Sequence, residues 1–292
     1  MLGSDLALQL SARHEVVGAG RRPAPHLSVP FHIMNLGQSK VVMDFIKREK
    51  PDVILHAAAK TEVDECETER RAALAENFES TRFVTDAGNQ INAAIIYFST
   101  DFVFDGTSRE PYKETDRPRP LSVYGETKLL AERYLMLRGR RFLILRTSWL
   151  FGKYGDNFPK KILRKAEEGK VARVVEDEFG NPTFTADLAG AVAELLNLLP
   201  KADEKKMNQI YHVTNEGTVS RFGFARAILK KKNLAADLVI PMPRASAHYA
   251  AARPQNSALA TEKIKSEFGI RLRSWEEALD AFLQEDLAPL TQ

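Results

Sequence analysis

Short, almost continuous runs of apolar residues alternate along the chain with longer amphipathic stretches. The apolar runs are typical of buried strands, and they lie at 15–19, 52–56, 94–98, 142–146 and 210–213. The stretches with helical periodicity lie near 38–50, 68–90 and 122–138. Near-continuous apolar strands separated by helices indicate an α/β protein with a doubly wound parallel sheet.

The regular alternation weakens after about residue 150, where loops that contain proline become frequent. We expect a main domain over 1–150, joined by part of 183–215, and a smaller lobe formed mainly by 151–292. Ligands of parallel sheets bind at the carboxyl ends of the strands. The smaller lobe is therefore expected to cover that edge of the sheet.

The composition excludes several classes of protein. With 292 residues, 44% of them hydrophobic, the chain can bury a core. Its net charge of +3 comes from dispersed residues and does not indicate nucleic-acid binding. No apolar run reaches membrane-spanning length and no signal-peptide pattern is visible, so we expect a cytoplasmic protein without a membrane partner. The one cysteine, Cys66, has acidic neighbours, and the histidine spacings do not fit a zinc site, so no metal is expected.

One short stretch carries candidate chemistry. Tyr124 and Lys128 lie on one face of a predicted helix, where an ammonium group can lower the pKa of a tyrosine. Upstream, in Ser99-Thr100-Asp101, the Thr100 hydroxyl can hold a carbonyl oxygen while Tyr124 gives that oxygen a proton. An isolated match would favour a surface tyrosine beside a solvated lysine. The position after a strand end, within alternating strands and helices, favours hydride transfer between a nicotinamide and a carbonyl carbon.

Other candidate residues follow predicted strands. Ala57-Ala58-Ala59 would let a flat cofactor approach the backbone, although three alanines can also begin a closely packed helix. Arg21 can pair with a ribose 2′-phosphate or be a solvated loop residue, which favours NADPH over NADH only slightly. Trp149 can stack on a sugar or base, or it can pack in the core, and the two interpretations are balanced.

The start of the chain, Met1-Leu2-Gly3, resembles the end of the glycine-rich turn that opens dinucleotide-binding folds. A helix with Gly3 near its cap is the alternative interpretation. The first strand of such a unit is absent, which would leave two neighbouring strands with unpaired buried edges. We expect the natural protein to begin about ten residues earlier, on a strand-turn-helix unit.

Several long motifs occur in an order that identifies a family. Residues 99–106, STDFVFDG, are similar to the pattern S-T-D-Y-V-F-D-G, and residues 124–128, YGETK, match Y-G-x-[ST]-K. Further matches lie at 50–59, 146–149, 156–158, 179–183 and 253–257. With these motifs, the chain resembles the extended short-chain dehydrogenase/reductases, and among them the dTDP-4-dehydrorhamnose reductases. The resemblance covers nearly the whole chain.

This resemblance implies a Rossmann-type fold, with a dinucleotide-binding domain in 1–150 and a substrate-binding lobe mainly in 151–292. It implies reduction of the 4-keto group of dTDP-4-dehydro-L-rhamnose to dTDP-L-rhamnose. NADPH, or NADH, would deliver hydride to C4 of the sugar, and Tyr124 would protonate the oxygen. Lys128 would lower the pKa of Tyr124 and bind the nicotinamide ribose, while Thr100 would orient the ketone.

The resemblance and the strand-end positions together imply two sets of binding residues. The cofactor would contact Gly3, Arg21, Asn35, Leu36, Ala57, Ala58, Ala59, Lys60, Thr61, Phe98, Tyr124 and Lys128. The nucleotide-sugar substrate would contact Thr100, Asp101, Trp149, Asn157 and Arg253.

The chain differs from the family pattern at four positions. The family usually has aspartate at Asn35, asparagine at His56, tyrosine at Phe102 and glutamine at Glu178. None of these differences removes a catalytic group. Two rival interpretations stay open: a non-catalytic regulatory subunit like the β subunit of methionine adenosyltransferase, against which Thr100 argues, and another sugar-nucleotide reductase or epimerase. The oligomeric state, including a homodimer, is also left open.

Overall fold

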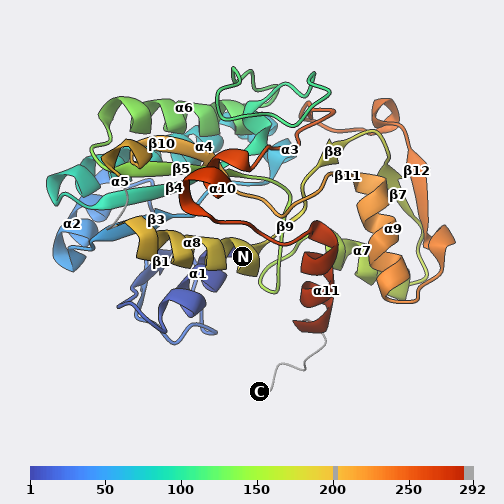
Figure 1. Ribbon diagram of the computed structural model, residues 1–292, viewed down its shortest axis with the longest axis horizontal. Helices are drawn as coiled ribbons and strands as arrows, with labels where there is room; N and C mark the ends of the chain where they lie inside the picture. The colour runs from blue at the N-terminus through green and yellow to red at the C-terminus, as the bar shows by residue number, and fades with distance from the viewer. Residues whose placement is uncertain (200–202, 286–292) are drawn as a thin grey trace.

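The main sheet holds four parallel strands in the order β10-β5-β4-β3 (Figure 1). The computed structural model describes residues 1–199 and 203–285. The strands are β3 (Val53–His56), β4 (Ala94–Thr100), β5 (Phe142–Thr147) and β10 (Gln209–His212). Every neighbouring pair is parallel. The α/β class with a parallel sheet is thus confirmed, and four of the five predicted strands coincide with these elements.

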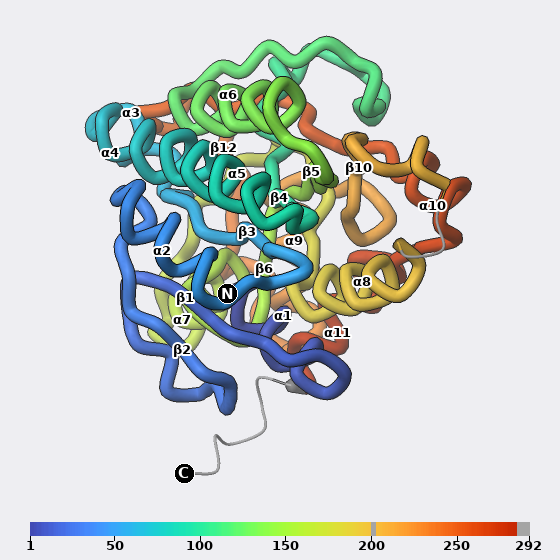
Figure 2. Tube along the Cα trace, turned by 90° about the vertical axis from the view of Figure 1, so that its left-hand side faces the viewer, coloured from blue at the N-terminus to red at the C-terminus, as the bar shows by residue number. Residues whose placement is uncertain are grey.

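Helices pack on both faces of this sheet, as Figure 2 shows from the side. Because side chains alternate along a strand, Ile96 and Phe98 of β4 point to one face and Ile95 and Tyr97 to the other. The first pair packs against α1 and α8, and the second pair packs against α6. The helices of this layer structure are α1 (Leu2–Leu10), α2 (Ser39–Glu49), α5 (Ser80–Gln90), α6 (Val123–Arg138) and α8 (Thr185–Leu198).

A separate two-stranded parallel sheet is formed by β1 (Gly18–Gly20) and β2 (Phe31–Ile33). The predicted strand over 15–19 is therefore wrong in its bounds, because only Gly18–Gly20 find partners on β2, a strand that the apolar pattern does not predict. Among residues 1–199 and 203–285, no strand pairs with the second edge of β1 or of β3. The unpaired edges are present as expected, and the residues of β1 and most of those of β3 are half-buried.

The helical stretch predicted near 68–90 is divided in the structure. It contains the end of α3 (Val63–Thr68), then α4 (Arg70–Ala73), a π-helical turn (Leu74–Glu79) and α5. Such widened turns often occur at functional sites. In the part of the chain that the structure describes, no helix combines the length and apolar composition needed to cross a membrane.

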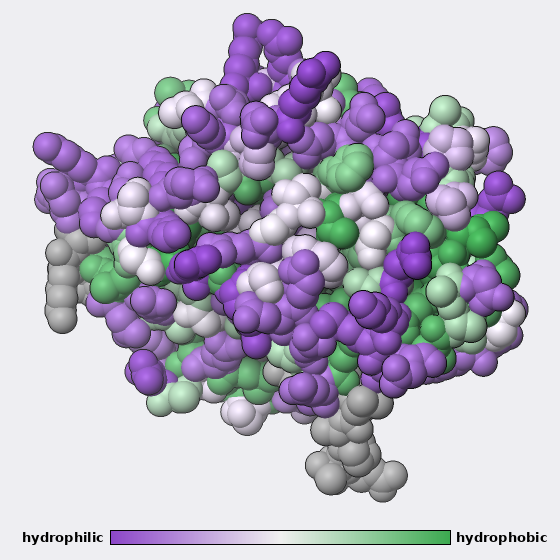
Figure 3. Space-filling view, turned by 45° about the vertical axis from the view of Figure 1, so that its right-hand side comes forward, coloured by the Kyte–Doolittle hydropathy of each residue, from purple (hydrophilic) through white to green (hydrophobic). Residues whose placement is uncertain are grey.

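The C-terminal lobe has its own aromatic core. Phe151, Phe184, Phe224 and Phe282 are fully buried, and their rings contact one another. The lobe lies on the right in Figure 1, and hydrophobic residues gather on the same side of the surface in Figure 3. Its elements are β6 (Leu150–Phe151), α7 (Phe158–Glu167), β7 (Ala172–Val175), β8 (Phe179–Gly180), β9 (Thr183–Phe184), β11 (Val219–Ser220), α9 (Arg221–Lys231), β12 (Val239–Met242) and α11 (Trp275–Glu285).

Part of the later sequence returns to the main sheet. The α8 helix packs against α1, and β10 pairs with β5. The short helix α10 (Glu262–Phe268) contributes Ile264 to the same core. The predicted ranges 183–215 and 151–292 include residues 200–202 and 286–292, which lie outside the described residues.

A buried histidine at the end of β3 predicts acid sensitivity. His56 is 4% exposed, and burial lowers its pKa from 6.5 to about 3. In the unfolded chain the imidazole takes up a proton below pH 6.5, whereas in the folded chain it does so only near pH 3, so folding loses stability as the pH falls between these values. At pH 5 this loss is roughly 2 kcal/mol.

Between pH 7 and pH 5 the unfolding free energy should fall less in His56→Asn than in the wild type. We expect a difference of roughly 2 kcal/mol between the two falls. Urea titrations at the two pH values measure the difference. His14→Asn, at an exposed position, is the control and should follow the wild type. Equal losses in His56→Asn and the wild type would contradict the expectation.

Candidate active site

The α6 helix brings the predicted catalytic residues to the end of β4. Ser122 caps the helix, because its Oγ accepts a hydrogen bond from the Gly125 N–H at 3.3 Å. A Cβ at Gly125 would lie 2.2 Å from the carbonyl oxygen of Phe102, so only glycine allows this close approach. The first turn of α6 therefore lies against the segment after β4, where Tyr124 forms a side-chain hydrogen bond with Thr100.

The Thr100 hydroxyl lies at the centre of a small hydrogen-bond network. It donates to Asp101 Oδ1 at 3.0 Å and accepts from the Phe102 N–H at 3.2 Å. Since its proton is directed to Asp101, it accepts from the hydroxyl of Tyr124. The structure thus brings together an acid and an orienting hydroxyl, at the strand end where the motifs predict them.

Burial sets the protonation states of these groups. Burial raises the pKa of Tyr124 above its usual value of 10 and lowers the pKa of Lys128 to about 7. Lys128 is not among the groups that shift the pKa of Tyr124 here, so its predicted effect on Tyr124 stays a prediction. Lys128 Nζ instead donates to the Phe98 carbonyl oxygen at 2.7 Å and lies 4.2 Å from the centre of the Tyr97 ring. Tyr124 is consequently protonated at neutral pH, which is the state that a proton donor needs.

A buried ion pair fixes α6 to the sheet one helical turn beyond Lys128. Arg146 of β5 donates to both carboxylate oxygens of Glu132, at 2.9 and 2.6 Å, and neither side chain is more than 1% exposed. Ser99 of β4 donates to the same carboxylate. The negative charge of Glu132 also raises the pKa of Lys128 against the effect of burial. Ser99, the first residue of the Ser99-Thr100-Asp101 motif, thus helps to position α6. The motif itself does not indicate this role.

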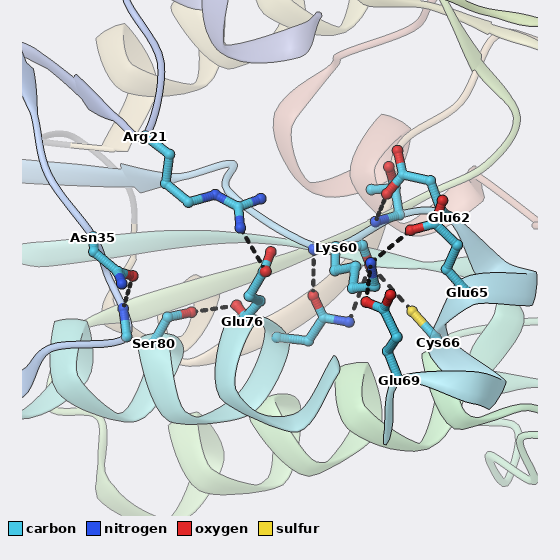
Figure 4. Close-up of polar contacts among 12 residues, drawn as sticks. Arg21, Asn35, Lys60, Glu62, Glu65, Cys66, Glu69, Glu76 and Ser80 are labelled. Atoms are coloured by element: carbon cyan, nitrogen blue, oxygen red, sulfur yellow. Dashed lines mark hydrogen bonds and ion pairs between the residues drawn. The ribbon is translucent and has the colours of Figure 1, made fainter. Parts of the chain in front are cut away.

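The loops after β1, β2 and β3 hold the residues predicted to bind a cofactor, and Figure 4 shows Arg21, Asn35 and Lys60 among them. Arg21 Nη1 lies 2.5 Å from Glu76 Oε1, but its side chain is 59% exposed and can still meet a phosphate. Asn35 Oδ1 accepts from the Gly37 N–H at 2.9 Å, which orients the amide. Cation, amide and small residues in these loops suit the phosphate, adenine and ribose of a dinucleotide.

Lys60 is held by carboxylates rather than directed into open space (Figure 4). Its Nζ lies 2.7 Å from Glu65 and 3.0 Å from Glu69, and hydrogen bonds to these carboxylates raise its pKa. A cofactor contact by Lys60 stays a prediction.

Asn77, in the π-helical turn, connects the cofactor loop to the catalytic helix. Its Oδ1 accepts from the Lys60 N–H at 2.8 Å, and its Nδ2 donates to the Lys60 carbonyl oxygen and to Thr127 Oγ1, both at 3.1 Å. Thr127 directly precedes Lys128 in α6. No motif in the sequence indicates a role for Asn77, and its signal is an asparagine in the middle of a stretch with helical periodicity.

The other predicted cofactor residues differ in their surroundings. Gly3 is exposed in α1, and a Cβ there would meet no atom within 4 Å. Ala58 and Thr61 are exposed, with Ala57 and Ala59 half-buried. Leu36 packs beside α2 and α5. The Phe98 side chain lies in the core against α1, so only its backbone, whose oxygen binds Lys128, is directed to the site.

Trp149 lies between β5 and β6 in a strained conformation. Its φ of 45° is in the left-handed region, which is rare for a bulky residue and is found most often at functional sites. The indole lies against Gly180, where a Cβ would come within 2.5 Å of the ring. The guanidinium carbon of Arg221 lies 3.5 Å from the ring centre. The side chain is half-buried and does not belong to the core clusters of the described residues.

Two predicted substrate residues are engaged in bonds within the chain. Asn157 caps α7: its Oδ1 accepts from the Lys160 N–H and its Nδ2 donates to the Gly152 carbonyl oxygen. Both ends of its amide bind the chain, and a substrate contact by Asn157 stays a prediction. Arg253 pairs with Asp64 through two hydrogen bonds, at 3.0 and 2.8 Å, which connect the lobe to α3.

Comparison with known proteins agrees with this arrangement. Residues 1–288 match the model of the RmlD substrate binding domain family. The chain belongs to this family. It is 37% identical to the dTDP-4-dehydrorhamnose reductase of Aggregatibacter actinomycetemcomitans, over 95% of this chain and 93% of that protein. The corresponding enzyme of Burkholderia thailandensis is 33% identical, over 98% and 96%.

A solved structure shows the same fold. The dTDP-4-dehydrorhamnose reductase of Bacillus anthracis, in complex with NADP, superposes with a TM-score of 0.84. It is 31% identical, over 97% of this chain and 96% of that chain. The Rossmann-type fold and the family predicted from the motifs are therefore confirmed.

The contact between Gly180 and Trp149 gives a prediction for substrate binding. An added methyl group in Gly180→Ala would displace the indole, and overpacking of this kind costs about 1–3 kcal/mol. We expect the affinity for dTDP-L-rhamnose to fall roughly tenfold or more, with the affinity for NADPH unchanged. Titration calorimetry measures both affinities.

Gly190→Ala is the matched control, because a Cβ there has ordinary space and the position is inside α8. Unchanged sugar-nucleotide binding in Gly180→Ala would show that the position of Trp149 does not matter for this ligand.

Proposed function

We propose that this protein reduces the 4-keto group of dTDP-4-dehydro-L-rhamnose to form dTDP-L-rhamnose, with NADPH as the preferred cofactor. The observation that carries the proposal is the juxtaposition of Thr100, Tyr124 and Lys128 at the carboxyl end of β4. It is supported by the likeness of nearly the whole chain to reductases of this name.

Each residue of this group has a distinct task in the proposed reaction. The bound NADPH supplies hydride to C4 of the sugar. Tyr124 holds a proton at neutral pH and gives it to the oxygen that becomes negative as hydride arrives. Thr100 donates a hydrogen bond that orients this oxygen, after turning from Asp101. Lys128 lies within the same buried site and binds the nicotinamide ribose.

The electrostatics of the site favour this direction of proton transfer. Burial raises the pKa of Asp101 to about 6, so it is ionised at pH 7 and accepts from Thr100. Lys128, with a pKa of about 7, is protonated in part of the molecules before a ligand binds. A negative charge that develops on the substrate oxygen favours the protonated form of Lys128, which in turn stabilises the phenolate left on Tyr124.

The proposal includes action in the cytoplasm. Cys66 is buried and free, as in proteins of a reducing compartment. The sequence leaves open whether the protein forms a homodimer. Sedimentation equilibrium would measure the oligomeric state.

The first test is NADPH oxidation with enzymatically generated dTDP-4-dehydro-L-rhamnose. We expect turnover by the wild type and a loss of about 10²- to 10⁴-fold in Tyr124→Phe, because only the proton donor is removed. The UDP-linked sugar should compete poorly.

Tyr134→Phe is the control, because Tyr134 also lies on α6 but its hydroxyl binds Asp86, away from the site. Near-normal turnover by Tyr124→Phe would remove Tyr124 from its role. Absence of turnover by the wild type would overturn the proposed function.

The second test concerns cofactor choice. Arg21→Ala should raise the KM for NADPH roughly tenfold and leave the KM for NADH unchanged, because only NADPH carries the 2′-phosphate. Steady-state kinetics with both cofactors measures the difference. Glu76→Gln, which removes the carboxylate that Arg21 now binds, should not raise the KM for NADPH. Equal changes for both cofactors in Arg21→Ala would place Arg21 outside the phosphate site.

A further inference from the structure

Arg221 occupies an unusual position beside the candidate active site. It is the first residue of α9, and its guanidinium stacks on Trp149 at 3.5 Å from the ring centre. Within the described residues, its guanidinium forms neither a hydrogen bond nor an ion pair. Burial lowers its pKa to about 10, which reflects the loss of water around this cation. Arg221 is half-buried, and its hydrogen-bond donors are unused within the described residues.

A buried carboxylate, Glu178, lies beside Arg221, in the connection between β7 and β8. Its side chain is 4% exposed, and Oε1 has no hydrogen-bond partner in the described part of the chain. The Arg221 N–H donates to the Glu178 carbonyl oxygen at 3.0 Å, so the two backbones are fixed together. Their side chains attract each other electrostatically but form no ion pair. A buried acid and a half-buried cation are therefore held near each other without an ion pair.

A purely structural role explains this arrangement poorly. Buried polar groups are almost always hydrogen-bonded, and buried charges are usually paired directly. The nearby arginines follow this rule: Arg253 binds Asp64, and Arg244 donates to the Arg253 carbonyl oxygen. The buried Oε1 of Glu178 does not follow the rule, and the half-buried guanidinium of Arg221 beside it makes no hydrogen bond. We infer that a ligand completes the hydrogen bonds of both groups.

The position of the pair indicates which part of a ligand it meets. Arg221 interacts electrostatically with Asp101, which is bound to the catalytic Thr100. The guanidinium also covers the ring of Trp149. A sugar that enters from this side contacts the rim of the guanidinium, close to the reacting ketone. The Glu178 carboxylate would repel a diphosphate group, whereas a hydroxyl group can donate to the acid and accept from the cation.

We propose that Arg221 and Glu178 bind the hydroxyl groups of the sugar next to the reacting ketone, with Arg221 donating and Glu178 accepting. This inference rests on the proposed function and deepens it, because it assigns recognition of the sugar ring to two residues that the motifs do not identify as contacts. Trp149 then serves as the support that orients Arg221.

The test compares the affinities for dTDP-L-rhamnose and for dTDP, which lacks the sugar, by titration calorimetry. Arg221→Met and Glu178→Met keep side-chain length but remove the hydrogen-bonding groups. Each should weaken binding of dTDP-L-rhamnose about 10- to 100-fold, as expected for a lost hydrogen bond to a charged group. Binding of dTDP should not change. Glu178→Gln keeps one acceptor oxygen and should retain most of the affinity.

Arg226→Gln is the matched control, because Arg226 is an exposed arginine on the same helix. Equal weakening of dTDP and dTDP-L-rhamnose would assign the pair to the diphosphate and overturn the inference. Unchanged binding in the folded Met variants would also overturn it. If Arg221→Met does not fold, as judged by circular dichroism, Glu178→Met decides the question. If only this inference is wrong, the wild type still reduces the keto sugar. If the proposed function is wrong, the wild type shows no turnover.

Discussion

The buried ion pair between Glu132 and Arg146 is the interaction on which the site depends. It joins α6 to β5, and Ser99 extends it to β4. Removing one partner of such a pair leaves an uncompensated charge in the core, which typically costs about 3–5 kcal/mol. Since Lys128 lies one helical turn before Glu132, this pair also determines how Lys128 meets the sheet. The geometry of the chemistry is therefore a consequence of core packing.

A second set of contacts connects the catalytic helix to the cofactor loop and the lobe. Asn77 bridges Lys60 and Thr127, while the pair between Asp64 and Arg253 connects α3 to the lobe. Both contacts use side chains to bind elements that are far apart in the sequence. The loop after β3 is thus held against α6, and the lobe is held against α3, by side chains of distant parts of the sequence.

Desolvation gives the site its chemical character. Burial raises the pKa of Tyr124, lowers that of Lys128 to about 7 and raises that of Asp101 to about 6. Charges on these groups are costly until a ligand or cofactor provides compensating charge and hydrogen bonds. The same reasoning applies to Glu178, whose Oε1 is buried without a partner in the described residues, and to the half-buried guanidinium of Arg221 beside it. The site is organised for a polar ligand that excludes water.

The sequence alone determines the parallel sheet, the helix over α6 and the family, because these depend on local periodicity and on contiguous motifs such as residues 99–106. It fails for β1, where the hydrogen-bond partner on β2 decides which residues form the strand. It does not show that the side chains of Asn157 and Lys60 bind other groups of the chain, because folding brings those groups close. The unused donors of Arg221 depend on the junction of β8, β11 and Trp149. Local pattern specifies elements, whereas the partner of each buried polar group is a property of the tertiary structure.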